Sequence, residues 1–334
     1  MPLDLVVPDL LPPADAPAAI RCVRLPALER WLARGDVVSE AVEGPYGWIA
    51  ARYGLPEPTP FAAISLAADG GARAGTWLRA DPVHLRIDHD ALALHDASIL
   101  EVSRSESTEL IAALQTHFAG DGLEFIAPDR ERWYVRVPDG EVPQTTPLWK
   151  AFGRNVFGLL PVAHGRFNWR SALTEAQMTL GGHVVNQRRE QEGKLAVNSV
   201  WFWGEGTSLA TIARPYGLVH ADDAFARGLA ILSGVGARSL PGKVDEIDLV
   251  AAGADALVVV DTLTAPLHRA DQKAWLAAAA ALDEGWFAHL GDAIARFDSV
   301  RLILPSERGT RVATLTAGAR WRIFRARRPL AAHA

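Results

Sequence analysis

The chain has 334 residues, of which 49% are hydrophobic and 22% are charged. This is ordinary globular composition, and it argues against extensive disorder. The net charge of −5 argues against a protein that binds nucleic acid through a broad basic face. The single cysteine, Cys22, excludes an internal disulfide and a cysteine-based zinc site.

The sequence lacks the features of a leader or a membrane span. The N-terminus has no basic region, and the apolar run that follows it is too short for a signal peptide. The apolar stretch 249–260 is interrupted by Asp255 and falls short of the roughly 20 residues that cross a bilayer. We therefore expect a soluble, cytoplasmic protein with no membrane partner and no nucleic-acid partner.

The first 70 residues predict one strand and three helices. A short apolar strand covers 4–8 and is followed by a proline-rich loop. Residues 25–33 have apolar side chains at helical spacing, which predicts an amphipathic helix. A second helix is predicted over 46–53, and the prolines at 58 and 60 open a third.

Residues 71–140 predict a separate α+β unit. Apolar and polar side chains alternate over 75–90, which is typical of a strand with one solvated face. The order strand, strand, helix, strand, strand then follows from the patterns over 75–90, 91–94, 105–118, 123–126 and 132–137. The proline-rich tract that follows closes this unit.

The rest of the chain alternates strands and helices. Residues 197–203 are nearly all apolar, which favours a parallel strand covered on both faces. Helices are predicted over 174–191, 223–232 and 268–297, and further strands over 217–220, 256–261, 300–304, 311–316 and 320–325. The simplest architecture is an α/β fold with a doubly wound, mostly parallel sheet, built from 1–70 and 141–334, with 71–140 inserted.

Polar residues follow several of the predicted sheet strands, where ligands of open parallel sheets bind. They are Glu205, the run from His220 to Asp222, Asp261 with Thr262, and Ser306 with Glu307. Helix caps and turn glycines occur at the same points in any such fold, so an ordinary structural role is the alternative.

Two clusters of charged residues lie outside these strand ends. The predicted insert holds Arg79, Asp81, His84, Arg86, Asp88, His89 and Asp90. Its arginines suit a phosphate or carboxylate, His84 with Asp88 suits a metal ion, and the alternative is a solvated strand face with ion pairs. The second cluster is His183, Asn186, Arg188, Arg189 and Glu190 near a helix C-terminus, where the helix dipole alone favours basic side chains.

Four segments resemble archaeal-type, cofactor-independent phosphoglycerate mutases of the alkaline-phosphatase group. Leu195-Ala-Val-Asn-Ser-Val-Trp-Phe-Trp-Gly-Glu-Gly206 is similar to a strand and glycine turn of these enzymes. The segments 226–242 and 256–271 follow in the same order, and 77–136 is similar to their substrate-binding insert. The resemblance implies an alkaline-phosphatase-like fold.

A second resemblance, to the bacterial RpfE-type regulatory proteins, spans almost the whole chain. The segments that carry it are Val7-Pro-Asp-Leu-Leu-Pro-Pro13, Leu25-Pro-Ala-Leu-Glu-Arg30, Trp77-Leu-Arg-Ala-Asp-Pro-Val-His-Leu85, Asn186-Gln-Arg-Arg-Glu190 and Val197-Asn-Ser-Val-Trp-Phe-Trp-Gly204. This resemblance implies a regulatory role.

The mutase resemblance also implies a site that this chain has largely lost. These enzymes hold two divalent metals beside a serine or threonine nucleophile. The first strand here runs into Pro8-Asp9-Leu10-Leu11, 144–148 lacks acidic residues and histidine, and 305–308 lacks an Asp-His pair. The resemblance leaves Asp261, His268 and Asp271 as remnants of one metal site.

These observations predict a catalytically degenerate, phosphoglycerate-mutase-like protein that needs no cofactor. Its partner is a phosphorylated or carboxylated small molecule, or a protein. The predicted ligand-binding residues are Arg79, Asp81, His84, Arg86, Asn186, Arg188, Arg189, Asn198 and Glu205. Two alternatives stay open: an active mutase or phosphohydrolase that uses Mn, Zn or Mg at an altered site, and a module that only binds other proteins.

Overall fold

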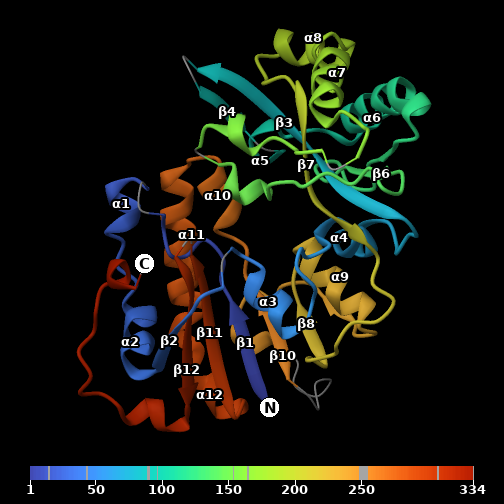
Figure 1. The fold of residues 1–334 in the computed structure, drawn as a ribbon. Helices are drawn as coiled ribbons and strands as arrows, with labels where there is room; N and C mark the ends of the chain where they lie inside the picture. Colours follow the sequence, from blue (N-terminus) through green and yellow to red (C-terminus); the bar gives the residue numbers. More distant parts are fainter. Residues whose placement is uncertain are drawn as a thin grey trace. The chain divides into compact units, whose positions relative to one another are not determined.

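The computed structural model describes residues 1–13, 16–42, 44–88, 91–95, 97–152, 154–163, 165–247, 255–306 and 308–333 (Figure 1). The chain divides into two compact units. The first comprises Met1–Leu55 and Thr211–Ala334, and the second comprises Pro56–Ala210. The second unit therefore contains the predicted insert 71–140 together with segments on both sides of it.

The first unit is built on a seven-stranded sheet with the order β2-β12-β11-β1-β10-β8-β9. Its strands are β1 (Pro2–Val6), β2 (Asp36–Glu40), β8 (Leu218–His220), β9 (Ala237–Arg238), β10 (Ala256–Val259), β11 (Ser299–Ser306) and β12 (Gly309–Thr316). The strands β11, β1, β10, β8 and β9 are parallel, whereas β12 and β2 add an antiparallel edge. The predicted α/β class with a mostly parallel sheet is confirmed.

Helices supply the apolar cover of this sheet. They are α1 (Ala18–Arg21), α2 (Pro26–Arg34), α3 (Gly47–Arg52), α9 (Ala224–Leu232), α10 (Thr264–His268), α11 (Gln272–Gly285) and α12 (Leu290–Arg296). The alternating residues Leu3 and Leu5 of β1 pack in one buried cluster with Trp31 of α2 and Trp275 of α11. Because strand side chains alternate, this cluster takes one face of the sheet.

The second unit is built on a five-stranded antiparallel sheet. Its strands are β3 (Thr76–Asp88), β4 (Ala91–His95), β5 (Glu124–Ile126), β6 (Tyr134–Val137) and β7 (Ser199–Thr207). Its helices are α4 (Phe61–Asp69), α5 (Ala97–Leu100), α6 (Arg104–Phe118), α7 (Trp169–Gly181) and α8 (Val184–Gln191). The predicted order of strands and helix between 75 and 137 is confirmed.

The predicted parallel strand over 197–203 is wrong in its pairing. This segment forms β7, which pairs antiparallel with β3 in the second unit. Phe202 lies in the apolar cluster that contains residues of α6 and α7, while α4 packs on β7 as well. The strand is apolar throughout because helices cover both of its faces, and that burial does not require parallel pairing.

Three further predictions need correction. The predicted strand over 320–325 is instead a 3₁₀ turn, Ala317–Trp321, followed by irregular chain. The predicted helix over 268–297 is interrupted, since α10, α11 and α12 are separate and Asp271 caps α11. The predicted helix over 174–191 is α7 and α8, separated at Gly182 and His183.

Among the described residues, none of the helices is both long and apolar enough to cross a membrane. The strand β2 was not predicted from the sequence. It is exposed along most of its length, so its apolar pattern is weak.

Candidate functional site

Four aspartates follow strands of the parallel sheet in the first unit. Asp9 comes after β1, Asp222 and Asp223 after β8, and Asp261 after β10. These three strands are parallel neighbours, so their carboxyl ends meet at one edge of the sheet. We call these four residues the acidic edge.

Asp9 is held by contacts from two helices. Its backbone has a φ of 59°, a conformation that few residues other than glycine adopt. Thr264 donates its hydroxyl hydrogen to Asp9 Oδ2 over 2.7 Å, and Trp275 Nε1 donates to the Asp9 carbonyl over 3.2 Å. The chain itself thus supplies partners for this residue.

Asp223 serves both a helix and a buried phenol. Its Oδ1 accepts from the backbone N–H of Ala226, which makes it the N-cap of α9. Its Oδ2 accepts from the Tyr46 hydroxyl over 2.7 Å. The preceding aspartate, Asp222, accepts from the backbone N–H of Leu240.

Two groups beside one another at this edge, Asp261 and Tyr46, have a raised pKa. Burial raises the pKa of Asp261 to about 6, and the neighbouring carboxylates of Asp223, Asp222 and Asp9 add to the effect. Burial also raises the pKa of the Tyr46 hydroxyl, again with Asp223, Asp261 and Asp9 contributing. The phenol is therefore a hydrogen-bond donor at neutral pH.

One histidine precedes the acidic edge on β8. His220 is 5% exposed, and its Nδ1 lies 2.9 Å from the Ser239 carbonyl oxygen. A carbonyl oxygen accepts only, so Nδ1 carries the hydrogen and Nε2 is the basic nitrogen. His220 Nε2 is buried without a hydrogen-bond partner among the described residues.

The described residues of the acidic edge do not fit a two-metal centre as they stand. Within the described part of the chain, the three acidic or imidazole residues that bring their ligand atoms within 4.8 Å of one another are Asp245, His289 and Asp292. They lie on the surface of the first unit, around the start of α12. Carboxylates of the acidic edge already accept hydrogen bonds from the chain, which leaves fewer lone pairs for two dications.

The predicted metal residues have separate places in this unit. Asp261 belongs to the acidic edge, and His268 ends α10. Asp271 accepts from the backbone N–H of Ala274 over 2.9 Å and so caps α11. Their assignment as metal ligands stays a prediction.

In the second unit, Arg79 and Asp81 form a buried ion pair on β3. The Arg79 guanidinium lies 5.3 and 5.2 Å from the ring centroids of Tyr134 and Trp203. Arg79 Nη2 lies 2.7 Å from Asp81 Oδ1, and Trp203 Nε1 donates to Asp81 Oδ2 over 2.7 Å. Arg79 is only 8% exposed, so an external anion would have to displace Asp81.

Two predicted ligand-binding residues of α8 hold the chain together. Asn186 donates to the carbonyls of Leu180 and Val197 and accepts from the Val197 N–H. Arg189 is 1% exposed and pairs with Glu106 of α6 over 2.8 Å. Both side chains are buried, which agrees with a structural role. Asn186 lies in the first turn of α8, and Arg189 lies in the last.

The remaining predicted residues of this unit are dispersed. Asn198 pairs with both backbone groups of Leu85, and His84 Nδ1 lies 2.8 Å from the Ala196 carbonyl oxygen. Glu205, predicted at the end of the parallel sheet, lies on β7 and accepts from Thr145.

Arg86 is exposed on β3, and Arg188 is exposed at the end of α8. The Asp88 side chain, His89, Asp90 and Glu307 lie outside the described residues.

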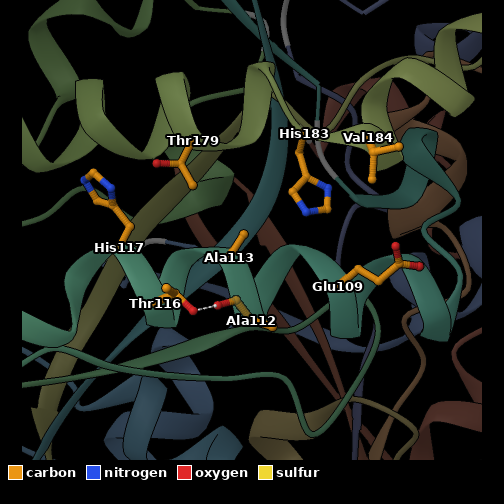
Figure 2. A pocket seen from close by; sticks show the side chains of 8 residues that line it. All are labelled: Glu109, Ala112, Ala113, Thr116, His117, Thr179, His183 and Val184. Carbon is orange, nitrogen blue, oxygen red and sulfur yellow. Dashed lines mark hydrogen bonds between the residues drawn. The ribbon is translucent and has the colours of Figure 1, made fainter.

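A groove of about 630 Å³ lies between α6 and the α7–α8 turn in the second unit (Figure 2). Figure 2 shows Thr179 and His183 pointing toward α6, where Ala113 and Glu109 line the opposite wall. Arg188 Nη2 pairs with Glu109 over 2.6 Å at this wall. Of the predicted ligand-binding arginines, Arg188 is thus the one that the structure brings beside a groove.

Sequence reasoning missed the gathering of Asp9, Asp223 and Tyr46. From the sequence alone, Asp9 is only a departure from a motif, and Tyr46 is only the start of a predicted helix. The available signal was positional, since an aspartate follows each of three parallel strands by two or three residues.

Comparisons with known proteins find distant relatives of this chain. No protein-family model matches it. A probable 2,3-bisphosphoglycerate-independent phosphoglycerate mutase of Geobacter sulfurreducens is 27% identical over 197 residues, which cover 57% of this chain and 49% of that protein. The phosphoglycerate mutase of the same name from Methanosarcina barkeri is 25% identical over 189 residues, 53% of this chain and 47% of that protein. The alignments thus span about half the length of the curated relatives.

Two solved structures align with most of the chain. The PH0037 protein from Pyrococcus horikoshii has a TM-score of 0.50 at 15% identity and covers 94% of this chain and 87% of its own. The cofactor-independent phosphoglycerate mutase from Thermoplasma acidophilum has a TM-score of 0.46 at 17% identity and covers 95% and 90%.

The fold is α/β, with a mostly parallel sheet in one unit and an antiparallel sheet in the other. The sequence relatives show that the chain is phosphoglycerate-mutase-like, with a distant relation to the 2,3-bisphosphoglycerate-independent enzymes.

Proposed function

We propose that this chain is a catalytically degenerate, phosphoglycerate-mutase-like protein that works by binding rather than by turnover. The observation that carries the proposal is the use of the acidic edge as a structural hydrogen-bond network. Asp223 caps α9 and accepts from Tyr46, and Asp9 accepts from Thr264. A carboxylate committed to donors of its own chain is a weaker ligand for a dication, because metal and donor compete for the same oxygens.

The Tyr46 hydroxyl extends the same network. Burial and the surrounding carboxylates raise the pKa of this hydroxyl, so at neutral pH it is a neutral phenol that donates to Asp223. This bond links the start of α3 to the cap of α9.

The proposed ligand is a phosphorylated or carboxylated small molecule, or a protein partner. Arg188 and Arg86 are the predicted arginines that are exposed, and Arg188 forms a solvent-exposed ion pair with Glu109. Arg79 and Arg189 are instead in buried ion pairs. A guanidinium at the rim of the groove between α6 and α7 suits a bidentate anion. We propose a regulatory role of the RpfE type, in the cytoplasm and without a cofactor.

The second candidate is an active, metal-dependent mutase or phosphohydrolase with an altered site. The pKa of Asp261, raised to about 6 by burial and by the other carboxylates, favours it, since a bound cation would relieve that repulsion. Asp261 and Asp9, with His268 and Asp271, are the residues that would hold such an ion.

The test combines turnover with a ligand screen on the purified full chain. We expect no conversion of 3-phosphoglycerate with Mn²⁺, Zn²⁺ or Mg²⁺, beside the Geobacter sulfurreducens relative as a positive control. We expect a phosphorylated or carboxylated metabolite to stabilise the fold, by about 2.7 kcal/mol at 100 times its dissociation constant. Arg188→Ala should abolish that stabilisation and Arg130→Ala, an exposed control, should keep it. Conversion at the rate of the control enzyme would contradict the proposal.

A further inference from the structure

The C-terminal part of the first unit presents apolar side chains to solvent. Trp321, Ile323 and Phe324 are 82%, 60% and 95% exposed. We call these three residues the apolar tip. A solitary exposed apolar side chain is ordinary, but three large ones within four positions form a surface that a partner covers.

Arginines between and after the residues of the apolar tip point toward the protein and hold the segment in place. Arg322 Nη1 donates to the Arg34 carbonyl and to Asp36 Oδ1 over 3.2 and 2.7 Å. Arg325 Nη1 donates to the Gly35 carbonyl over 2.8 Å and lies 3.3 Å from the same carboxylate. These two guanidinium groups therefore point toward the protein, while the apolar tip points toward solvent. In a strand that packs on a core, the apolar side chains would point inward instead.

The segment is anchored at both ends. Ala319 before it and Leu330 after it are each 1% exposed, and both belong to the buried cluster of the first unit. The apolar tip is thus presented by a fixed loop, so binding a partner costs little conformational entropy.

The charge around the apolar tip is strongly basic. Residues 317–333 contain five arginines and no acidic residue, in a chain whose net charge is −5. Arg327 and Arg328 lie three and four residues after Phe324 and are exposed. Apolar side chains flanked by guanidinium groups complement a surface that is anionic outside and apolar within.

We propose that the apolar tip docks the protein on an anionic lipid bilayer, with Trp321 and Phe324 inserted at the interface and Arg327 and Arg328 against the headgroups. Tryptophan side chains favour the interface between the headgroups and the acyl chains of a membrane.

Other partners fit the apolar tip less well. The Ile323 side chain suits insertion into a bilayer, but it has no ring on which a base can stack, which disfavours single-stranded nucleic acid as the partner. A second copy of the chain could instead pair with the exposed edge strand β2. If two β2 strands paired antiparallel about Val38, Asp36 of each would face Glu40 of the other copy, and the repulsion of like charges disfavours this dimer. The inference goes beyond the proposed function and replaces the expectation of no membrane partner.

The experiment is flotation of the full chain with phosphatidylcholine vesicles, with and without phosphatidylglycerol. We expect binding only to the anionic vesicles, and at least a tenfold loss of it in the Trp321→Ala/Phe324→Ala double variant. Arg327→Gln/Arg328→Gln should weaken binding and flatten its dependence on salt. Phe157→Ala is the matched control, because Phe157 is also exposed, at 63%, and lies in the second unit.

Unfolding midpoints verify that each variant is folded, and the exposure of the substituted side chains predicts little change. Equal flotation of the wild type with both kinds of vesicle, or an unchanged double variant, would overturn the proposal. So would a wild-type dimer that the double variant dissociates without any vesicle binding, or RNA binding that the same variant abolishes.

Discussion

The Tyr46 hydroxyl lies 2.7 Å from Asp223 Oδ2, and the other oxygen of that carboxylate caps α9. One side chain thus ties two helices of the first unit to the carboxyl edge of the parallel sheet. Both oxygens of this carboxylate therefore have partners within the chain.

The first prediction concerns this link. Asp223→Ala should lower the free energy of unfolding by about 2 kcal/mol, because it removes a helix cap and the acceptor of a buried hydroxyl. Asp223→Asn keeps an oxygen for the cap and should lose less than half of that. Urea denaturation measures both. Equal losses would show that the charge, not the cap, matters.

The second prediction is a pH dependence at Asp261. Its pKa is raised to about 6, above the ordinary value of 3.8, so the folded state binds this proton more tightly than the unfolded state. Its carboxylate therefore removes stability progressively as pH rises from about 4 to about 6. Asp261→Asn should gain ~1–3 kcal/mol above pH 6 and little below pH 4.

Denaturation over this pH range measures the effect of Asp261→Asn. The matched control is Asp271→Asn, because asparagine caps a helix as well as aspartate does and Asp271 is exposed. A gain that does not vary with pH would contradict the assigned cause.

The third prediction tests the structural role of Arg79, which pairs with Asp81. Arg79→Met leaves the Asp81 carboxylate buried without its cation and should cost about 3–5 kcal/mol of unfolding free energy. In Arg79→Met/Asp81→Asn the charge is removed as well, and an oxygen is kept for Trp203 Nε1, so the loss should be smaller. Urea denaturation measures the free energy of unfolding of both variants. A double variant less stable than the single one would refute this account of the pair.

The fourth prediction compares two glycines that share a φ of 70°, Gly193 and Gly204. A Cβ at Gly204 would lie 2.9 Å from Phe61 Cβ, whereas at Gly193 it meets open space. Gly193→Ala should therefore cost only the backbone strain, about 1 kcal/mol, and Gly204→Ala about 1–3 kcal/mol more. Equal losses in urea denaturation would mean that Phe61 can move aside.

Local patterns predicted most elements, because strands such as β10 and helices such as α6 carry their own periodicity. The pairing of the strands was harder to predict from the sequence. The apolar run of β7 reports burial on two faces and says nothing of which strand lies beside it, so its antiparallel pairing with β3 was missed. The predicted strand over 320–325 was wrong for a related reason, since the alternation of side chains does not reveal which set of them faces solvent.

The site was predictable only in part. Asp261 was recognised because it ends the clearest buried strand. Asp9 and Asp223 were not, since their proximity depends on the order β1-β10-β8, which no local pattern contains. The hydrogen bonds that make Arg79, Asn186 and Arg189 structural also depend on tertiary contacts that residue type alone cannot show.

The central claim is that the acidic edge does not hold a bimetallic centre, and equilibrium dialysis against Mn²⁺ tests it most directly. The same measurement on Asp9→Asn, Asp261→Asn and His289→Ala assigns any bound ion to the acidic edge or to the surface group of Asp245, His289 and Asp292. We predict no tightly bound Mn²⁺ that depends on Asp9 or Asp261. Two equivalents per chain, lost in both Asp9→Asn and Asp261→Asn and kept in His289→Ala, would contradict the account.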